Sequence, residues 1–385
     1  MSFTEPPERL ALRTAAAALA TSYGHEYYQD KARSGGHTTE LWDEAGRLGY
    51  LGVSVPEEYG GGGAGIGELA AVCEEFCAAG TPMLLMVVSP AICATVIARF
   101  GTGEQKQRWL PGFAAGTVRM AFAITEPDAG SNAHRITTTA HRDGSDWVLT
   151  GRKVFISGVD EADAVLVVGR TEDARTGKLR PALFIVPTDT PGFEYRQIPM
   201  DLVSADKQFG LFLDEVRLPA DALAGSADAA IAQLFAGLNP ERIMGASFSV
   251  GIARYALDKG VAYAKQRSVF GAPIGSHQGI AHPLAQVKIE LELAKLMTQK
   301  AAALYDSGDD FGAGEAANMA KYAGAEVAIK AVDQAVQVHG GNGLASEYGL
   351  GTLLGAARVG RIAPVSREMV LNFVAQHSLG LPKSY

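Results

Sequence analysis

The feature that most constrains the fold is the order in which helical and strand-like patterns follow one another. Residues 8–116 are alanine-rich with helical periodicity, residues 119–224 hold short β-branched and aromatic runs between turns, and helical periods return after residue 226. Helices and strands therefore do not alternate, which argues against a doubly wound parallel sheet. The order predicts an α+β fold with a helical domain at residues 1–118, a β domain at residues 119–225 and a helix bundle at residues 226–385.

Bulk properties exclude several classes of protein. The 385 residues are 47% hydrophobic and 20% charged, an ordinary globular composition that requires no membrane. A net charge of −8 argues against a nucleic-acid partner. The cysteines Cys73, Cys77 and Cys93 are too few for a disulfide framework and lack the spacing of a metal site. Glu5 and Glu8 stand where a signal peptide would be basic, so we expect a cytoplasmic protein without a bound metal.

The most informative segment is residues 121–132, Ala-Phe-Ala-Ile-Thr-Glu-Pro-Asp-Ala-Gly-Ser-Asn, at the start of the β region. A short extended run offers backbone groups along one edge, Pro127 ends it, and Gly130 with Ser131 lets the main chain approach a ligand closely. Backbone donors of this kind suit a flavin, because they stabilise the negative charge of the reduced ring. From composition alone, an ordinary strand-to-turn connection is the simpler interpretation.

Six parts of the sequence occur in one known family, in the same order and at matching spacing. Residues 125–131 are similar to a flavin-binding signature, Thr-Glu-Pro-x-Ala-Gly-Ser-Asp, although Asn132 replaces the final Asp. The others are Trp42 with residues 48–52 and 56–61, then residues 100–111, 151–158, 267–271 with 277–278, and 337–343. Together they resemble the acyl-CoA dehydrogenase family over nearly the whole chain. The resemblance implies a C-terminal four-helix bundle, FAD as cofactor, and α,β-desaturation of an acyl-CoA thioester.

Carried over position by position, the resemblance implies two groups of FAD contacts. The first group belongs to the β region: Phe122, Ile124, Thr125, Gly130, Ser131, Phe155 and Ser157. The second would come from a neighbouring subunit: Arg267, Phe270, Gln278, Gln337, Gly340 and Gly341. Ser366 and Glu368 match the last cofactor contacts more loosely. Arg267 suits the diphosphate because a guanidinium can bind two phosphate oxygens, although a solvated charge at a helix end is an alternative. The resemblance also implies a homotetramer and an electron-transfer flavoprotein as partner.

The reaction needs a base for the Cα proton, and a carboxylate in an apolar pocket is suitable because desolvation raises its pKa. Many family members supply this glutamate from a Tyr-Glu-Gly-Thr segment, which aligns with residues 363–366, so that Pro364 stands at its position. Members resembling isovaleryl-CoA and long-chain acyl-CoA dehydrogenases carry the base before an arginine that opens the first long C-terminal helix. That position holds Glu241, followed by Arg242, which makes Glu241 the predicted base.

Three alternatives remain open. Glu241 could merely complement the positive N-terminus of a helix that begins near Pro240. The substrate channel would be lined by Leu238 and Asn239, with Arg242 behind the site and Ser131 near the thioester. Pro364, Asn132 and the absence of the usual Gly-x-Arg from residues 201–210 also allow a non-catalytic FAD-binding subunit, or a flavoenzyme of the same fold that acts as an oxidase or hydroxylase. Chain length and the choice between CoA and an acyl carrier protein are not fixed by the sequence.

Overall fold

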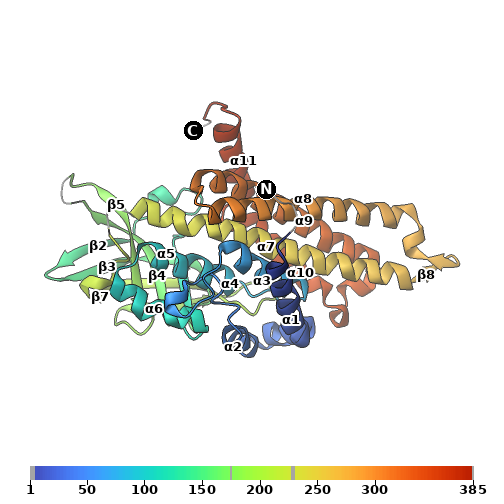
Figure 1. The fold of residues 1–385 in the computed structure, drawn as a ribbon, viewed down its shortest axis with the longest axis horizontal. Coiled ribbons are helices and arrows are strands. Elements are labelled where there is room, and N and C mark those ends of the chain that lie inside the picture. The colour runs from blue at the N-terminus through green and yellow to red at the C-terminus, as the bar shows by residue number, and fades with distance from the viewer. Residues whose placement is uncertain (1–4, 174–175, 227–229, 384–385) are drawn as a thin grey trace.

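The computed structural model describes residues 5–173, 176–226 and 230–383, and it confirms the predicted succession of helices, strands and helices (Figure 1). The first region comprises α1 (Pro7–Ser34), α2 (Thr39–Arg47), α3 (Ile66–Ala78), α4 (Leu85–Val88), the π-helix η2 (Ser89–Ala94), α5 (Thr95–Phe100) and α6 (Gly103–Ala115). The sequence sets both ends of α6. Thr102 and Gln105 form a reciprocal capping box at its start, and Gly116 ends it at a φ of 72°.

The second region is a seven-stranded sheet in the order β1-β4-β2-β3-β7-β6, with β5 paired to β4. Its strands are β1 (Met120–Ala123), β2 (Thr139–Asp143), β3 (Asp146–Ser157), β4 (Ala164–Glu172), β5 (Leu179–Pro187), β6 (Phe193–Ile198) and β7 (Gln208–Leu218). The short strand β1 runs parallel to β4 and is buried on both faces. Met120 and Phe122 face one hydrophobic cluster while Ala121 and Ala123 face another, as the two-residue period of a strand requires.

The third region is the predicted helix bundle. It comprises α7 (Ala230–Gln266), the hairpin strands β8 (Ser268–Val269) and β9 (Ala272–Pro273), α8 (Gln278–Asp306), α9 (Asp310–His339), α10 (Leu350–Ile362) and α11 (Arg367–Phe373). Alanines and glycines allow the helices to approach closely: a Cβ on Gly324 of α9 would lie 3.0 Å from the Ala246 carbonyl of α7. In Figure 1 the sheet lies at the left end of the molecule and the β8–β9 hairpin at the right end.

Buried charges join the first region to the bundle. Glu74 and Glu75 on α3 bind Arg254 of α7 at 2.6 and 2.8 Å, and both also bind Arg13 of α1. Buried charges must be paired to offset the loss of hydration, so this cluster fixes the relative positions of three helices. Within the described residues, no helix has the length and apolar character needed to cross a lipid bilayer.

Candidate active site

The predicted cofactor segment leaves the sheet at Ala123 and forms a turn with a fixed base and an open tip. The Thr125 carbonyl accepts a hydrogen bond from the Val154 N–H at 3.0 Å, and Glu126 and Ala129 exchange backbone hydrogen bonds of 3.1 and 3.2 Å. Gly130 and Ser131 are exposed, and a Cβ on Gly130 would meet no atom within 4 Å. The tip of the turn is therefore free to contact a ligand.

A buried ion pair holds the base of this turn. The Glu126 carboxylate accepts hydrogen bonds from the backbone N–H and the hydroxyl of both Thr137 and Thr138, at 2.6 to 2.9 Å. Lys153 of β3 donates to Glu126 at 2.9 Å and to the Ile124 carbonyl at 3.0 Å. Burial raises the pKa of Glu126, but the hydrogen bonds outweigh it and lower this pKa to about 2. The carboxylate thus stays charged and ties the turn to β3.

The predicted residue Phe155 lies beside the same turn because β3 is irregular there. The register between β3 and β7 shifts between Lys153 and Ile156, and Phe155 has a φ of 58°. Such bulges redirect a side chain out of the sheet and are common beside active sites. The Phe155 side chain is 57% exposed, and Ser157 two residues later exchanges hydrogen bonds with Gln208. Phe122, in contrast, is buried in the hydrophobic core with 9% exposure.

The second group of predicted cofactor residues gathers at the far end of the bundle. Phe270 and Gly271, with φ of 57° and 78°, form the tip of the β8–β9 hairpin, and Phe270 is 95% exposed. Arg267 at its base and Gln278 at the start of α8 are also exposed.

The end of α9 lies next to that hairpin. His339 stacks on Tyr263 of α7 with ring centres 4.1 Å apart, and Asn342 donates to the Tyr263 hydroxyl at 3.0 Å. His339 also bonds the Ala335 carbonyl at 2.7 Å, so its ring is used in packing. This contact presents the exposed residues Gln337, Gly340 and Gly341 on the surface that carries the hairpin.

The two predicted groups do not meet within one chain. Phe155 belongs to the sheet, and Thr125 and Ser131 to the turn that follows β1. Arg267 and Phe270 lie by the β8–β9 hairpin at the opposite end of the long axis (Figure 1). A single bound cofactor could contact both groups only if a second copy of the chain supplied one of them.

Glu241 lies on α7 close to the strand that leads into the cofactor turn. Burial raises its pKa to about 7, although the positive charges of Arg242 and Lys321 act in the opposite direction. In the described part of the chain, no group donates a hydrogen bond to its carboxylate. The charge of Glu241 also helps burial to raise the pKa of the Cys93 thiol in η2. The Cys93 sulfur lies 3.6 Å from the Ala121 carbonyl of β1. Glu241 is therefore a half-buried carboxyl between the bundle and the sheet, and its burial is the main cause of its raised pKa.

The structure corrects the alternative interpretation of Glu241. Helix α7 spans Ala230–Gln266, so Pro240 lies inside the helix instead of at its start. The positive N-terminus of a helix acts within its first turn, and Glu241 stands well beyond that turn. The interpretation of Glu241 as an N-terminal helix charge was wrong because a proline does not always mark a helix start.

The segment that replaces the usual base lies next to Glu241 on the same helix face. A Cβ on Gly245, four residues after Glu241, would lie 3.4 Å from the Pro364 ring. The following residue, Val365, accepts a hydrogen bond at its carbonyl from Lys321 of α9. The two candidate positions for a base, 241 and 364, thus lie close to one face of α7, and of the two only Glu241 can bind a proton.

Comparison with known sequences agrees with this geometry. The chain matches the acyl-CoA dehydrogenase N-terminal domain over residues 6–117, the middle domain over residues 121–214 and the C-terminal domain over residues 231–379. The chain belongs to the acyl-CoA dehydrogenase family. The predicted family, fold and enzyme class are therefore confirmed, and family members are oxidoreductases that act on CH–CH bonds.

Relatives within the acyl-CoA dehydrogenase family match over the full length. Acyl-CoA dehydrogenase FadE12 of Mycobacterium tuberculosis is 70% identical over 384 residues, which cover 100% of this chain and 99% of that protein. A glutaryl-CoA dehydrogenase in complex with glutaryl-CoA has a TM-score of 0.94 at 28% identity, covering 100% of this chain and 98% of the other. The glutaryl-CoA dehydrogenase of Mycobacterium smegmatis, in complex with FADH2, has a TM-score of 0.89 at 28% identity, covering 99% and 96%.

Other predicted residues of this acyl-CoA dehydrogenase are engaged by the protein itself. Asn239 donates to the Asp310 carbonyl at 3.2 Å and accepts from Arg242 at 3.3 Å, while Leu238 is half-buried nearby. Ser366 caps α11 by accepting a hydrogen bond from the Met369 N–H at 3.4 Å, and Glu368 is exposed in the first turn of that helix. Their predicted roles as substrate and cofactor residues stay predictions.

Sequence reasoning missed the two buried lysines. Glu126 and Lys153 belong to two of the family-like segments, residues 125–131 and 151–158, but neither segment indicates that the two side chains meet. Lys321 left one signal: with Ala317, Gly324 and Ala328 it falls on the helical spacing of a buried face, where a lysine is unexpected.

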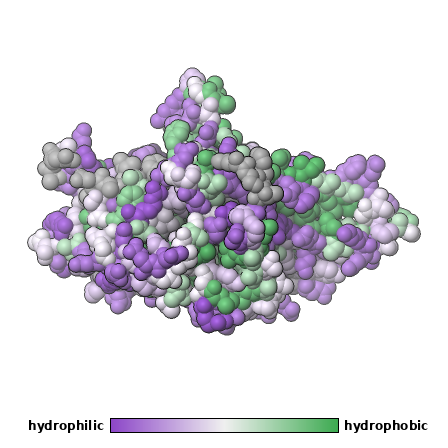
Figure 2. All heavy atoms as spheres, in the orientation of Figure 1, coloured by the Kyte–Doolittle hydropathy of each residue, from purple (hydrophilic) through white to green (hydrophobic). Residues whose placement is uncertain are grey.

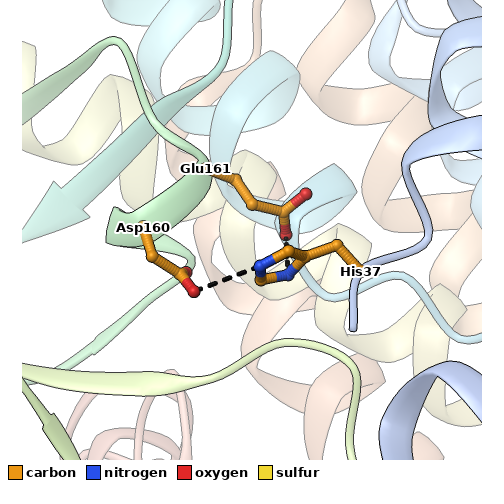
Figure 3. A group of neighbouring side chains, drawn as sticks. All are labelled: His37, Asp160 and Glu161. Carbon is orange, nitrogen blue, oxygen red and sulfur yellow. Dashed lines mark ion pairs between the residues drawn. The ribbon is translucent and has the colours of Figure 1, made fainter. Parts of the chain in front are cut away.

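One cluster of possible metal ligands lies outside the site. His37, Asp160 and Glu161 converge where the first region meets the sheet, with His37 at 3.2 Å from Asp160 and 2.9 Å from Glu161 (Figure 3). Lys207 approaches both Asp160 and His37, at 3.1 and 3.2 Å. Its ammonium already supplies the positive charge there, so the cluster is best explained as an ionic contact between domains.

Proposed function

We propose that this protein oxidises an acyl-CoA thioester to the α,β-unsaturated product, with Glu241 as the base that removes the Cα proton. The observation that carries this proposal is the state of the Glu241 carboxyl. It is desolvated beside the sheet that bears the cofactor turn, and its pKa of about 7 is near that of an effective base at neutral pH. Pro364, at the other base position, cannot titrate.

The residues of the cofactor turn fit FAD. The exposed tip at Gly130 and Ser131 lets the backbone approach a ligand, and Phe155 offers an aromatic face directed away from the sheet. Thr125, whose carbonyl accepts a hydrogen bond from Val154 of β3, is the proposed neighbour of the reactive end of the ring. When bound, FAD accepts the hydride from the substrate Cβ.

The chain's own contribution to the chemistry is proton transfer and orientation. Near pH 7 a substantial fraction of Glu241 is ionised, and this carboxylate takes the Cα proton and keeps it while the double bond forms. The exclusion of water that raises its pKa also strengthens any hydrogen bond to the thioester oxygen. Leu238 and Ser131 are the proposed neighbours of the acyl chain and the thioester.

We also propose that two copies complete each FAD site. Arg267, Phe270 and Gln278 are exposed at the end of the bundle, where a two-fold related copy can bring them to the cofactor turn of its partner. Helix α8 offers a second surface: Ile289, Leu293 and Leu296 are exposed at helical spacing. Figure 2 shows apolar side chains at the upper right of the molecule, where Figure 1 places α8. These surfaces support a dimer of dimers, which passes electrons to an electron-transfer flavoprotein.

Anaerobic reduction of the bound FAD by a panel of short, branched and long acyl-CoAs tests the chemistry. Glu241→Gln should slow flavin bleaching by about 10²- to 10⁴-fold, the usual contribution of a general base, while retaining FAD. Asp258→Asn, which removes an exposed carboxyl from the same helix, is the matched control and should bleach like the wild type. Equal bleaching in the Glu241→Gln protein would exclude Glu241 as the base.

Co-expression of two defective chains tests the shared site. Arg267→Ala should weaken FAD binding, and Glu241→Gln should abolish the chemistry. A mixed dimer has one intact site of two, which combines Glu241 from one chain with Arg267 from the other. With random pairing about half of the dimers are mixed, so about a quarter of the wild-type activity should return. No recovery in a demonstrated mixed dimer would argue that each chain builds its own FAD site.

A further inference from the structure

Lys321 is a charged residue in the buried face of α9. Its side chain is among the largest fully buried ones, with 2% exposure, and one turn further along the helix Gly324 packs against the Ala246 carbonyl of α7. A buried ammonium is costly unless acceptors and a negative charge surround it. Among the described residues, the ammonium of Lys321 has one hydrogen-bond acceptor, the Val365 carbonyl in the segment after α10. Lys321 therefore links α9 to the segment that replaces the usual catalytic loop.

Charged groups from three elements face Lys321. Burial lowers its pKa to about 8, Arg242 of α7 acts in the same direction, and Glu241, Glu326 and Glu368 oppose them. Glu326 is already paired with Arg361 and Arg367, and Glu368 lies 3.5 Å from Arg367. Among these carboxyls, and within the described residues, Glu241 is the one without a salt bridge.

Arg242 is the other positive group beside Glu241, and it lowers the pKa of Glu241 more than Lys321 does, but its hydrogen bonds go to its own helix. Its Nη1 donates to the Leu238 carbonyl at 3.5 Å and to Asn239 at 3.3 Å. Lys321 instead joins α9 to residues 363–366, and this segment packs against α7 beside Glu241. Val365 follows Pro364, whose ring packs at Gly245, one helical turn from Glu241.

We propose that Lys321 is a positioning residue for Glu241: it holds residues 363–366 against α7 through the Val365 carbonyl and keeps a fixed positive charge beside the base. This proposal rests on the proposed role of Glu241. A nearby positive charge favours the ionised carboxylate, so Lys321 limits how far burial can raise the proton affinity of the base. Because Lys321 stays protonated below about pH 8, its charge is present while Glu241 titrates.

The test is the pH dependence of flavin reduction in FAD-loaded protein carrying Lys321→Met or Lys321→Arg. Lys321→Met should move the rise of the rate with pH upward by about one pH unit, so that the rate below this rise falls about tenfold more than the rate at high pH. Lys321→Arg should leave the pH profile unchanged. Lys330→Met is the matched control on α9, because Lys330 is partly exposed and pairs with Glu290. A purely structural role would lower the rate equally at every pH.

A second measurement does not depend on turnover. In difference infrared spectra of substrate-free protein, the band lost in Glu241→Gln identifies the protonated Glu241 carboxyl, and its titration should shift upward in Lys321→Met. Lys321→Gln keeps a donor for Val365 and should show the same shift; a wild-type titration in either variant would overturn the proposal. If no acyl-CoA bleaches the wild-type flavin, the proposed function fails, but the infrared titration still decides the role of Lys321.

Discussion

A buried lysine lies near a glutamate at two places in the site, and the two glutamates differ in how the carboxylate is surrounded. Glu126 accepts four hydrogen bonds from Thr137 and Thr138 and one from Lys153, and its pKa falls to about 2. Glu241 has Lys321 nearby but no hydrogen-bond donor in the described part of the chain, and burial raises its pKa to about 7. The same two residue types thus produce one permanent charge and one titratable group.

The difference indicates what each pair does. A carboxylate that is fully hydrogen-bonded cannot accept a proton near neutral pH, so Glu126 serves as a structural anchor for the cofactor turn. A desolvated carboxyl without donors exchanges its proton in the range where a base must work. Hydrogen bonding, more than burial or the nearby lysine, separates the two roles.

The largest effect should come from breaking the structural pair. Lys153→Met leaves Glu126 charged and buried without its ion-pair partner, and it frees the Ile124 carbonyl. Loss of one partner of a buried pair costs about 3–5 kcal/mol, so urea unfolding should show a loss of this size. The FAD content should fall as well, because the base of the turn is no longer tied to β3.

Arg152→Met provides the control for this prediction. Arg152 is the exposed neighbour of Lys153 on β3, and its removal should change the free energy of unfolding by no more than about 0.5 kcal/mol. If Lys153→Met were as stable as Arg152→Met, the pair could not be the anchor of the turn.

A smaller effect of opposite sign is expected at Glu241. Because its pKa in the folded protein lies above the ordinary 4.5, the stability that its proton contributes is complete below pH 4.5 and is lost as the pH rises through about 7. Glu241→Gln remains neutral and avoids this loss. The free energy of unfolding of the variant should therefore be about 1–3 kcal/mol higher than that of the wild type at pH 8, and nearly the same as that of the wild type at pH 5.

Glu126→Gln is the counterpart of this measurement. The low pKa of Glu126 means that its stabilisation is complete above pH 4.5 and is lost only as the pH falls through about 2. Glu126→Gln should therefore be less stable than the wild type at both pH 5 and pH 8. Shifts of the same sign in the two glutamine variants would contradict the assignment of one anchor and one base.

The sequence predicted the fold because the information for it is local: the change from helical to strand periodicity is determined by nearby residues. The cofactor and substrate residues carried over from the family resemblance stay predictions. The start of α7 was placed too late because Pro240 was interpreted as a first-turn residue, whereas a long helix packed on several neighbours tolerates it.

The pairing of side chains could not be predicted in this way. Lys153 reaches Glu126 across 27 residues, and Lys321 reaches Val365 across 44. These contacts depend on how β3 lies against the cofactor turn and how α9 lies against residues 363–366. The periodicity of the sequence does not define either arrangement. The pKa of Glu241 likewise depends on its burial and on charges from α7 and α9 together.

The smallest expected effect tests how much a single hydrogen bond to Glu126 contributes to stability. Thr137→Val removes one hydroxyl donor, 2.8 Å from Glu126, but keeps the backbone donor and the other three bonds. A single hydrogen bond to a charged acceptor contributes about 1.5–3 kcal/mol, and the exposure of Thr137 should keep the loss near the lower value. Thr139→Val, at the next residue but one, is the control and should cost less. If Thr137→Val cost as much as Lys153→Met, the hydrogen bonds would act as one cooperative unit, and the contrast with Glu241 would lie in that network as a whole.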